Sequence, residues 1–177
     1  RQWSRGLGDV YKRQSLNKIM KPQFLFAIVF IAFFISCSDK NTIVSEYVDI
    51  PNSKFSFLDT VNFKVPINDT VNNHDVFLQL RTSTDYKWSN MFIFSDIVFP
   101  NGKIRSDTFQ IFITDKNGHW TGNKSGAMVN FNHYLYRNIK FPIKGEYQFK
   151  FNQAMRDTIL NEVISLGLKI NKLDKQS

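Results

Sequence analysis

Apolar and polar side chains alternate with a period of two through much of this chain, as they do in half-buried β-strands. The alternation is clearest at Tyr147–Phe151 and at Ile164–Ile170, where every second residue is aromatic or aliphatic. Such a register turns one face of a strand toward the core. The last strand is therefore expected to bury Ile164, Leu166, Leu168 and Ile170.

The same pattern recurs in shorter stretches separated by turns. Pro100–Gly102 and Asp115–Gly118 contain Asn-Gly pairs, which favour tight turns. His119–Phe131 is irregular and is predicted to be a long loop. The further predicted strands are Phe55–Phe57, Val61–Val65, Val76–Thr82, Met91–Phe99, Thr108–Thr114 and Tyr134–Phe141. Many short strands without a competing amphipathic helix predict an all-β fold, an antiparallel β-sandwich of the immunoglobulin-like or jelly-roll-like kind.

One stretch departs from this pattern, because Phe24–Ile35 is an unbroken apolar run. It follows Met20 and a lysine, and it ends at a serine and Cys37, the only cysteine of the sequence. These are the parts of a secretory signal peptide, and the run is shorter than the ~20 residues that a membrane-spanning helix needs. We predict a lipoprotein signal peptide at residues 20–36, with Cys37 as the lipidation site. An ordinary signal peptide with an incidental cysteine, or a buried core helix, are the alternatives.

The length of 177 residues favours one domain behind this signal. Residues 1–19 contain RQWSRGLGDVYKRQ, which resembles adaptor read-through, and they are interpreted as an artefactual leader. Residues 37–45 are polar and are expected to form a tether. Residues 46–172 are expected to form the sandwich, followed by a polar tail at 173–177.

Charge and composition exclude some classes of partner. The formal net charge is +8, but the basic excess falls largely within residues 1–36. The remainder has no cluster of Lys and Arg of the kind that binds nucleic acid, so no nucleic-acid partner is expected. Once Cys37 is acylated no thiol remains, and the core alone must hold the fold.

No arrangement of reactive side chains indicates catalysis. The histidines at 74, 119 and 133 are isolated and lack the close spacing of metal ligands. There is no G-x-S-x-G motif, and the carboxylates are scattered. The sequence therefore predicts no metal, no cofactor, no small-molecule substrate and no enzyme activity.

Aromatic residues in two predicted loops are candidates for contact with a partner, since aromatic anchors dominate protein interfaces. The candidate contacts are Asp85, Tyr86, Trp88 and Trp120. The tryptophans are equally compatible with covering the open end of the sandwich. A carbohydrate-binding surface lipoprotein is the alternative function; exposure of both tryptophans on one flat face would support it, and their burial would count against it.

Several segments, in order along the chain, resemble the GldH family of gliding motility lipoproteins of Bacteroidetes. They are EYVDIPN (46–52), LRTSTDYKWSNMFIF (80–94), FPNGKIRSDTFQI (99–111), DKNGHWTG (115–122), FPIKGEYQFKFNQAMRD (141–157) and ISLGLKI (164–170). The resemblance implies a lipid-anchored, non-catalytic component of the gliding machinery and of type IX secretion, with other proteins of that machinery as partners. It carries over one functional position, Cys37. Ser38 is compatible with outer-membrane sorting. No run of acidic residues follows it, so no surface-export signal is evident; a periplasm-facing location is expected, with the choice of membrane left open.

Overall fold

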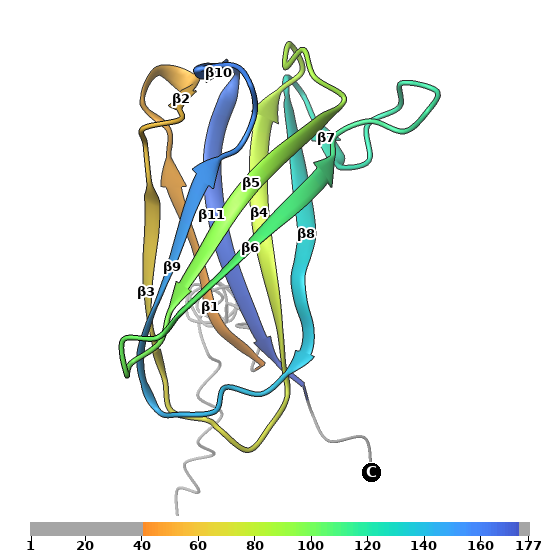
Figure 1. Cartoon of the computed structure of the whole chain (residues 1–177). Coiled ribbons are helices and arrows are strands. Elements are labelled where there is room, and N and C mark those ends of the chain that lie inside the picture. The colour runs from red at the N-terminus through yellow and green to blue at the C-terminus, as the bar shows by residue number, and fades with distance from the viewer. Residues whose placement is uncertain (1–40, 174–177) are drawn as a thin grey trace, which may run out of the picture. The chain divides into compact units, whose positions relative to one another are not determined.

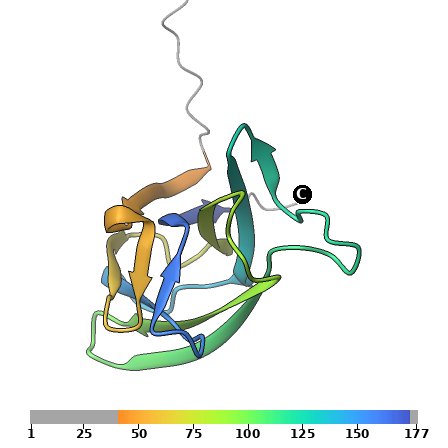
Figure 2. The same cartoon turned by 90° about the horizontal axis from the view of Figure 1, so that it is seen from above.

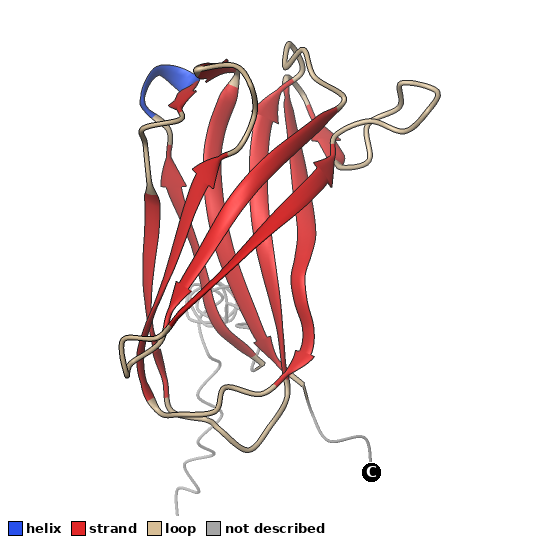
Figure 3. Cartoon of the chain, in the orientation of Figure 1, coloured by secondary structure: helices blue, strands red, loops and turns tan. Residues whose placement is uncertain are grey.

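The computed structural model describes residues 41–173, and the predicted leader, signal peptide and Cys37 lie outside the described residues. This part of the chain is built almost entirely of strands, with one short 3₁₀ helix (Figure 3). In chain order the elements are β1 (Thr42–Asp49), η1 (Pro51–Ser53), β2 (Lys54–Ser56), β3 (Val61–Ile67), β4 (His74–Ser83), β5 (Asn90–Val98), β6 (Ile104–Phe112), β7 (Asn123–Ser125), β8 (Met128–Ile139), β9 (Gly145–Gln153), β10 (Ile159–Asn161) and β11 (Val163–Lys172).

Two antiparallel sheets form the domain (Figure 1). We call β3-β9-β5-β6 the front sheet and β1-β11-β4-β8-β7 the back sheet, while β10 and β2 form a small pair of their own. Viewed from above, the front and back sheets line opposite sides of the domain (Figure 2). The predicted antiparallel β-sandwich is confirmed.

The core lies between the inner faces of these sheets. Leu166, Leu168 and Ile170 of β11 are fully buried, as predicted, and they face the rings of Phe149 and Phe151 from β9 across the core cluster. Side chains of this size contribute about 1.5–3 kcal/mol each when buried. The alternating register therefore supplies most of the stability of the domain.

Ile164 was expected in the same row, but its side chain is half-buried and lies outside the core. The pairing of β11 with β4 shifts register between Val163 and Ser165. A bulge of this kind adds one residue to a strand and changes which side chains face inward. Val163 consequently takes the buried position.

The prediction of a long loop at His119–Phe131 is wrong. This stretch contains β7 and the beginning of β8, where Val129 and Phe131 point into the core. The residue between them is Asn130, and the asparagines of β8 conceal the alternation because asparagine is depleted in strands.

The first strand begins earlier than the expected start of the domain at residue 46. β1 starts at Thr42, inside the stretch expected to form the tether, and it pairs along its length with β11. Val44 lies opposite Ile170 and is buried. A single inward valine is sufficient to add these residues to the sheet, although their neighbours are polar.

A chain of aromatic rings closes the end of the sandwich at which β1 begins. The ring of Phe141 lies 5.2 Å from that of His74 and 5.0 Å from that of Tyr147, and Phe99 lies 5.2 Å from Tyr147. At this end the amide of Lys172 also donates to the carbonyl of residue 41, at 2.7 Å. We call this the tether end and the opposite end the loop end.

Side-chain contacts join β6, an edge strand of the front sheet, to β8 of the back sheet. The hydroxyl of Tyr136 donates to Asp107 Oδ2 at 2.5 Å, and Arg105 Nε donates to the same oxygen at 2.7 Å. Phe109 meets the Tyr136 ring edge-on, at a centroid distance of 5.5 Å. The hydrogen bond from Tyr136, assisted by Arg105, lowers the pKa of the Asp107 carboxyl. Burial of Tyr136 raises the pKa of its phenol.

The buried face of β11 predicts the effect of a charge placed on either side of it. Leu166→Asp puts a carboxylate without a partner into the core and should destabilise the domain by about 4 kcal/mol or more. Lys169→Glu, on the outer face, should change stability by about 0.5 kcal/mol or less. Thermal unfolding of both variants measures this, and similar midpoints for the two would reject the assignment of faces.

The Tyr136–Asp107 contact predicts a pH-dependent loss of stability. The folded protein holds the pKa of Asp107 below its unfolded value, so the stabilising contribution is present above the unfolded pKa and is lost as pH falls through the folded pKa. Tyr136→Phe should lower the free energy of unfolding by about 1 kcal/mol at neutral pH. Denaturant titrations at pH 7 and well below 3.8, the ordinary pKa of the carboxyl, should show the difference from wild type shrinking. A difference that is the same at both pH values would contradict this account.

Candidate functional site

Three adjoining hollows lie along the loop end of the front sheet. We call the three hollows, taken together, the loop-end groove. The largest, of about 950 Å³, lies between the outer face of β5 and β6 and the β9–β10 loop. A second, of about 370 Å³, shares residues 154–157 with it, and a third, of about 500 Å³, shares Asn90 with the second. The groove is therefore continuous, and its size is in the range of ligand and partner sites.

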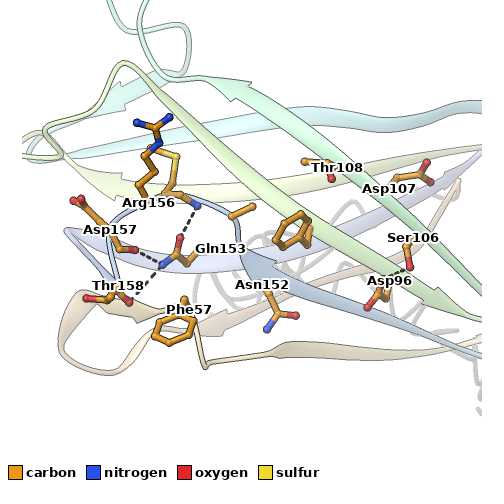
Figure 4. Close-up of a pocket in the computed structure, with 13 residues that line it drawn as sticks. Phe57, Asp96, Ser106, Asp107, Thr108, Asn152, Gln153, Arg156, Asp157 and Thr158 are labelled. Atoms are coloured by element: carbon orange, nitrogen blue, oxygen red, sulfur yellow. Dashed lines mark hydrogen bonds between the residues drawn. The ribbon is translucent and has the colours of Figure 1, made fainter.

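The side-chain amide of one buried glutamine makes the hydrogen bonds that position the rim of the groove (Figure 4). Gln153, the last residue of β9, donates from Nε2 to the carbonyl of Asp157 at 2.7 Å, and its Oε1 accepts from the amide of Met155 at 2.7 Å. The side chain is 3% exposed. Because a buried amide is costly to leave without partners, these bonds fix the path of residues 154–158.

The floor of the groove is apolar where it meets solvent. Phe57 from the β2–β3 turn and Phe94 from β5 are 51% and 52% exposed, and both line the largest hollow. Trp88 and Phe92 line the second hollow, and Phe112 lines the third. Exposed apolar side chains gathered in one depression are typical of surfaces that bind a partner.

Several polar side chains along the groove are held by hydrogen bonds. The hydroxyl of Ser106 donates to Asp96 at 2.5 Å, between neighbouring strands (Figure 4). Asn152 Nδ2 donates to the carbonyl of Asp59 at 2.9 Å and to Thr60 at 2.8 Å. These contacts fix the positions of the side chains that they join.

The structure brings together the two loops in which partner contacts were predicted. The carbonyl of Ser89 accepts from the amides of Ile113 and Thr114, at 2.9 and 3.1 Å. Thr114 also bridges to Trp120, so the loop after β6 folds back beside the loop before β5. Trp88 and Thr121 both line the groove.

The predicted contact residues lie in different environments. Trp88 is 38% exposed in the groove, and Asp85 is exposed on the same loop. Tyr86 is 5% exposed and belongs to the core cluster, so its side chain is not presented on the surface as those of Asp85 and Trp88 are. Burial also raises the pKa of its phenol. Trp120 is half-buried and packs against the core.

This distribution counts against the carbohydrate-binding alternative, which exposure of both tryptophans on one flat face would support. Only Trp88 of the two offers an open ring, and the ammonium of Lys87 lies 4.7 Å from the centre of that ring. The aromatic surface of the groove comes instead from phenylalanines of β5 and its neighbours.

Sequence reasoning missed the floor of the groove, although a signal was present. Phe92 and Phe94 alternate with Met91 and Ile93, so β5 is apolar on both faces. Met91 and Ile93 are fully buried, while Phe94 faces solvent. A strand with two apolar faces is either covered by a layer on each side or exposed on one of them. In β5 the outer face, which carries Phe94, is exposed.

The histidines do not converge on a site. His74 is buried against Phe141, His119 is exposed and 3.2 Å from Asp115, and His133 is half-buried on β8. Within residues 41–173 no group of three or more His, Cys, Asp or Glu residues is placed to hold a metal ion. In the same part of the chain, no helix has the length and apolar character needed to cross a membrane.

Solved structures match this chain only at low similarity. A periplasmic inhibitor of g-type lysozyme from Aeromonas hydrophila aligns with 78% of this chain and 93% of its own, at 10% identity and a TM-score of 0.32. A score this low carries no argument about function.

Sequence comparison is more specific. A protein of Christiangramia forsetii, named gliding motility lipoprotein GldH homolog, is 32% identical over 157 residues, covering 85% of this chain and 96% of the relative. The gliding motility lipoprotein GldH of Flavobacterium johnsoniae is 24% identical over 154 residues, covering 83% of this chain and 95% of the relative. The model of the family described as GldH lipoprotein matches residues 42–170, nearly the whole described domain. On these matches, the chain belongs to the GldH lipoprotein family.

Proposed function

We propose that this chain is a lipid-anchored, non-catalytic component of the gliding motility machinery and of the type IX secretion associated with it. Its relatives are named gliding motility lipoproteins, and it spans almost their full length. The observation that carries the proposal is the loop-end groove, a depression with exposed phenylalanines in which several polar side chains are held by hydrogen bonds. Such a surface suits non-covalent assembly.

Lipidation at Cys37 places the domain in the cell envelope, facing the periplasm. The chain enters the sandwich at the tether end, where β1 begins. From Cys37 to residue 41 it reaches at most about 14 Å. The tether end therefore stays close to the membrane, and the groove at the loop end is presented to partners in the envelope.

Confinement to a membrane surface raises the effective concentration of the domain toward other membrane-bound proteins. An interface with a few aromatic anchors is then sufficient for assembly. Trp88 and Phe94 are the anchors that the geometry favours, since each is partly exposed and lines the groove. Asp85 stands on the adjoining loop, and Trp120 supports the groove from behind.

The lipid anchor predicts a defined biochemical phenotype. Cys37→Ser removes the thiol that accepts the lipid, so the variant should stay unprocessed or become soluble. Metabolic labelling with radioactive palmitate, followed by membrane fractionation, measures both effects. Equal labelling of the variant and the wild type would refute the assignment of Cys37.

The functional proposal predicts that deleting the gene from its native gliding host abolishes spreading on agar and impairs export of adhesins. Colony spreading and adhesin in the culture fluid are the two measurements, and re-expression of the wild-type chain should restore both. A deletion strain that spreads and secretes normally would defeat the proposal.

The proposed role of the groove predicts that variants of its aromatic residues rescue the deletion strain only in part. Trp88→Ala combined with Phe94→Ala should restore spreading less well than wild type, because both anchors are lost while the core is untouched. Tyr134→Ala is the matched control, since Tyr134 is 38% exposed, like Trp88, but lies on the back sheet. Full rescue by the double variant at wild-type protein levels would remove the groove from the interface and leave the motility role standing.

A further inference from the structure

The edge strands of the two sheets differ in how well they are protected. The edge of β1 is interrupted by a register shift between Thr42 and Val44, and β7 is only three residues long. β3 carries Lys64 and Pro66. Bulges, short length, lysine and proline are the features that prevent an edge from pairing with another strand. β3 and β7 are thus protected, whereas β1 is regular from Val44 to Asp49 but does not line the groove.

β6, the remaining edge of the front sheet, has no bulge, lysine or proline and is not short, and its two charged residues, Arg105 and Asp107, are paired with each other. It runs for nine residues without proline and in unbroken register with β5. Within residues 41–173 no strand lies beyond it. A regular, exposed edge of this length is a template for an additional strand.

The antiparallel ladder fixes which backbone groups of this edge are open. Alternate residues bond to the neighbouring strand, and the residues between them direct N–H and C=O away from it. Just past the end of β6, Ile113 donates to the carbonyl of Ser89 at 2.9 Å, so odd-numbered residues bond toward β5. The open groups belong to Ile104, Ser106, Thr108 and Gln110.

The edge is closed at one end only. The hydroxyl of Thr121 donates to the carbonyl of Phe112 at 2.5 Å, which ends the open stretch at the loop end. Ser106 and Thr108 line the largest hollow of the groove. A strand added beside them would place every second side chain along the groove.

The outward side chains of β6 are uncharged, and its two charged residues, Arg105 and Asp107, are held by one another and by Tyr136. The guanidinium of Arg105 also lies 4.5 Å from the centre of the Tyr136 ring. β6 itself therefore places no outward charge against an added strand, while Asp96, Arg156 and Asp157 line the adjoining hollow.

We propose that β6 receives an extended segment of a partner protein of the envelope, which pairs with its open edge and extends the front sheet by one strand. This inference deepens the proposed function and rests on it. Backbone hydrogen bonds hold the segment, and alternate side chains of the segment enter the groove. The site thus recognises an extended chain and not a folded surface.

A second copy of this chain does not fit the same edge on one membrane. Two copies that pair through the same strand edge about a two-fold axis run antiparallel. β6 starts near the tether end, where Phe99 packs on Tyr147, so the second copy would point its tether end the opposite way. A strand of this length spans about 30 Å. The link from Cys37, with its reach of about 14 Å, cannot bridge that distance to the same bilayer.

The test uses the full-length lipidated chain in its native host. A photo-reactive phenylalanine analogue replaces Phe94, which lies opposite Thr108 on the outer face, or Tyr134 on the back sheet as control. Irradiation should give an adduct from position 94 and none from position 134. Mass spectrometry of the adduct should locate the bond in an extended segment of another protein.

Two substitutions at one position separate strand pairing from side-chain contact. Thr108→Pro removes an N–H that faces the open side, which an edge strand tolerates. Thr108→Ala keeps that N–H and removes only the side chain. The proline variant should reduce adduct formation about fivefold or more, as expected for one lost backbone hydrogen bond, and the alanine variant should leave it close to wild type.

Hydrogen exchange gives a second readout that does not depend on how the proline variant folds. In the isolated wild-type chain the amides of Ser106, Thr108 and Gln110 should exchange faster than those of Asp107 and Phe109. In the purified adduct they should become protected.

Equal adduct formation by the proline and alanine variants, unchanged exchange in the adduct, no adduct at position 94, or an adduct of two copies of this chain would each overturn the inference. These outcomes are independent of the motility test. A deletion strain that still glides would refute the role in gliding and leave the strand pairing intact.

Discussion

The domain depends on burial of one apolar face from each of two antiparallel sheets. The chain has a single cysteine, so no intrachain disulfide can share this role. The alternation that places Tyr147, Phe149 and Phe151 inside also places Gln153 inside, two residues further along β9. Its amide then needs partners, and it finds them in the loop that forms the rim of the groove. The shape of the binding surface is therefore a consequence of the register of the core.

The front and back sheets serve different purposes. The back sheet supplies β1, through which the chain is joined to its tether, and β8, whose Tyr136 holds β6 in place. The front sheet carries the aromatic groove on its outer face and an unprotected edge beside it. Side-chain recognition and backbone recognition thus lie next to each other, which allows a partner to be selected by sequence and by conformation together.

The fold class could be predicted from the sequence because apolar and polar side chains alternate wherever one face of a strand is buried and the other is exposed to solvent. Sequence reasoning failed where that contrast was weak: Val129 and Phe131 alternate with asparagines, and a bulge turns Val163 inward in place of Ile164. For the site, it located the loop of Trp88 but placed Tyr86 on the surface. Amino-acid composition does not distinguish an aromatic residue that is buried in the core from one that is exposed on the surface. The groove joins residues from distant parts of the chain, and only the sheet topology brings these together.

The direction in which β1 enters the sandwich has a mechanical consequence. β1 runs from the tether end toward the loop end and is paired antiparallel with β11 along its length. Under the proposed arrangement, a pull between the segment that precedes β1 and a partner bound at the groove would act along the strands. The hydrogen bonds between β1 and β11 are then loaded together in shear and are not opened one after another, as they would be by a sideways pull. In a machine that moves cells, an anchor strand with this geometry resists force far better than its few buried side chains alone would allow.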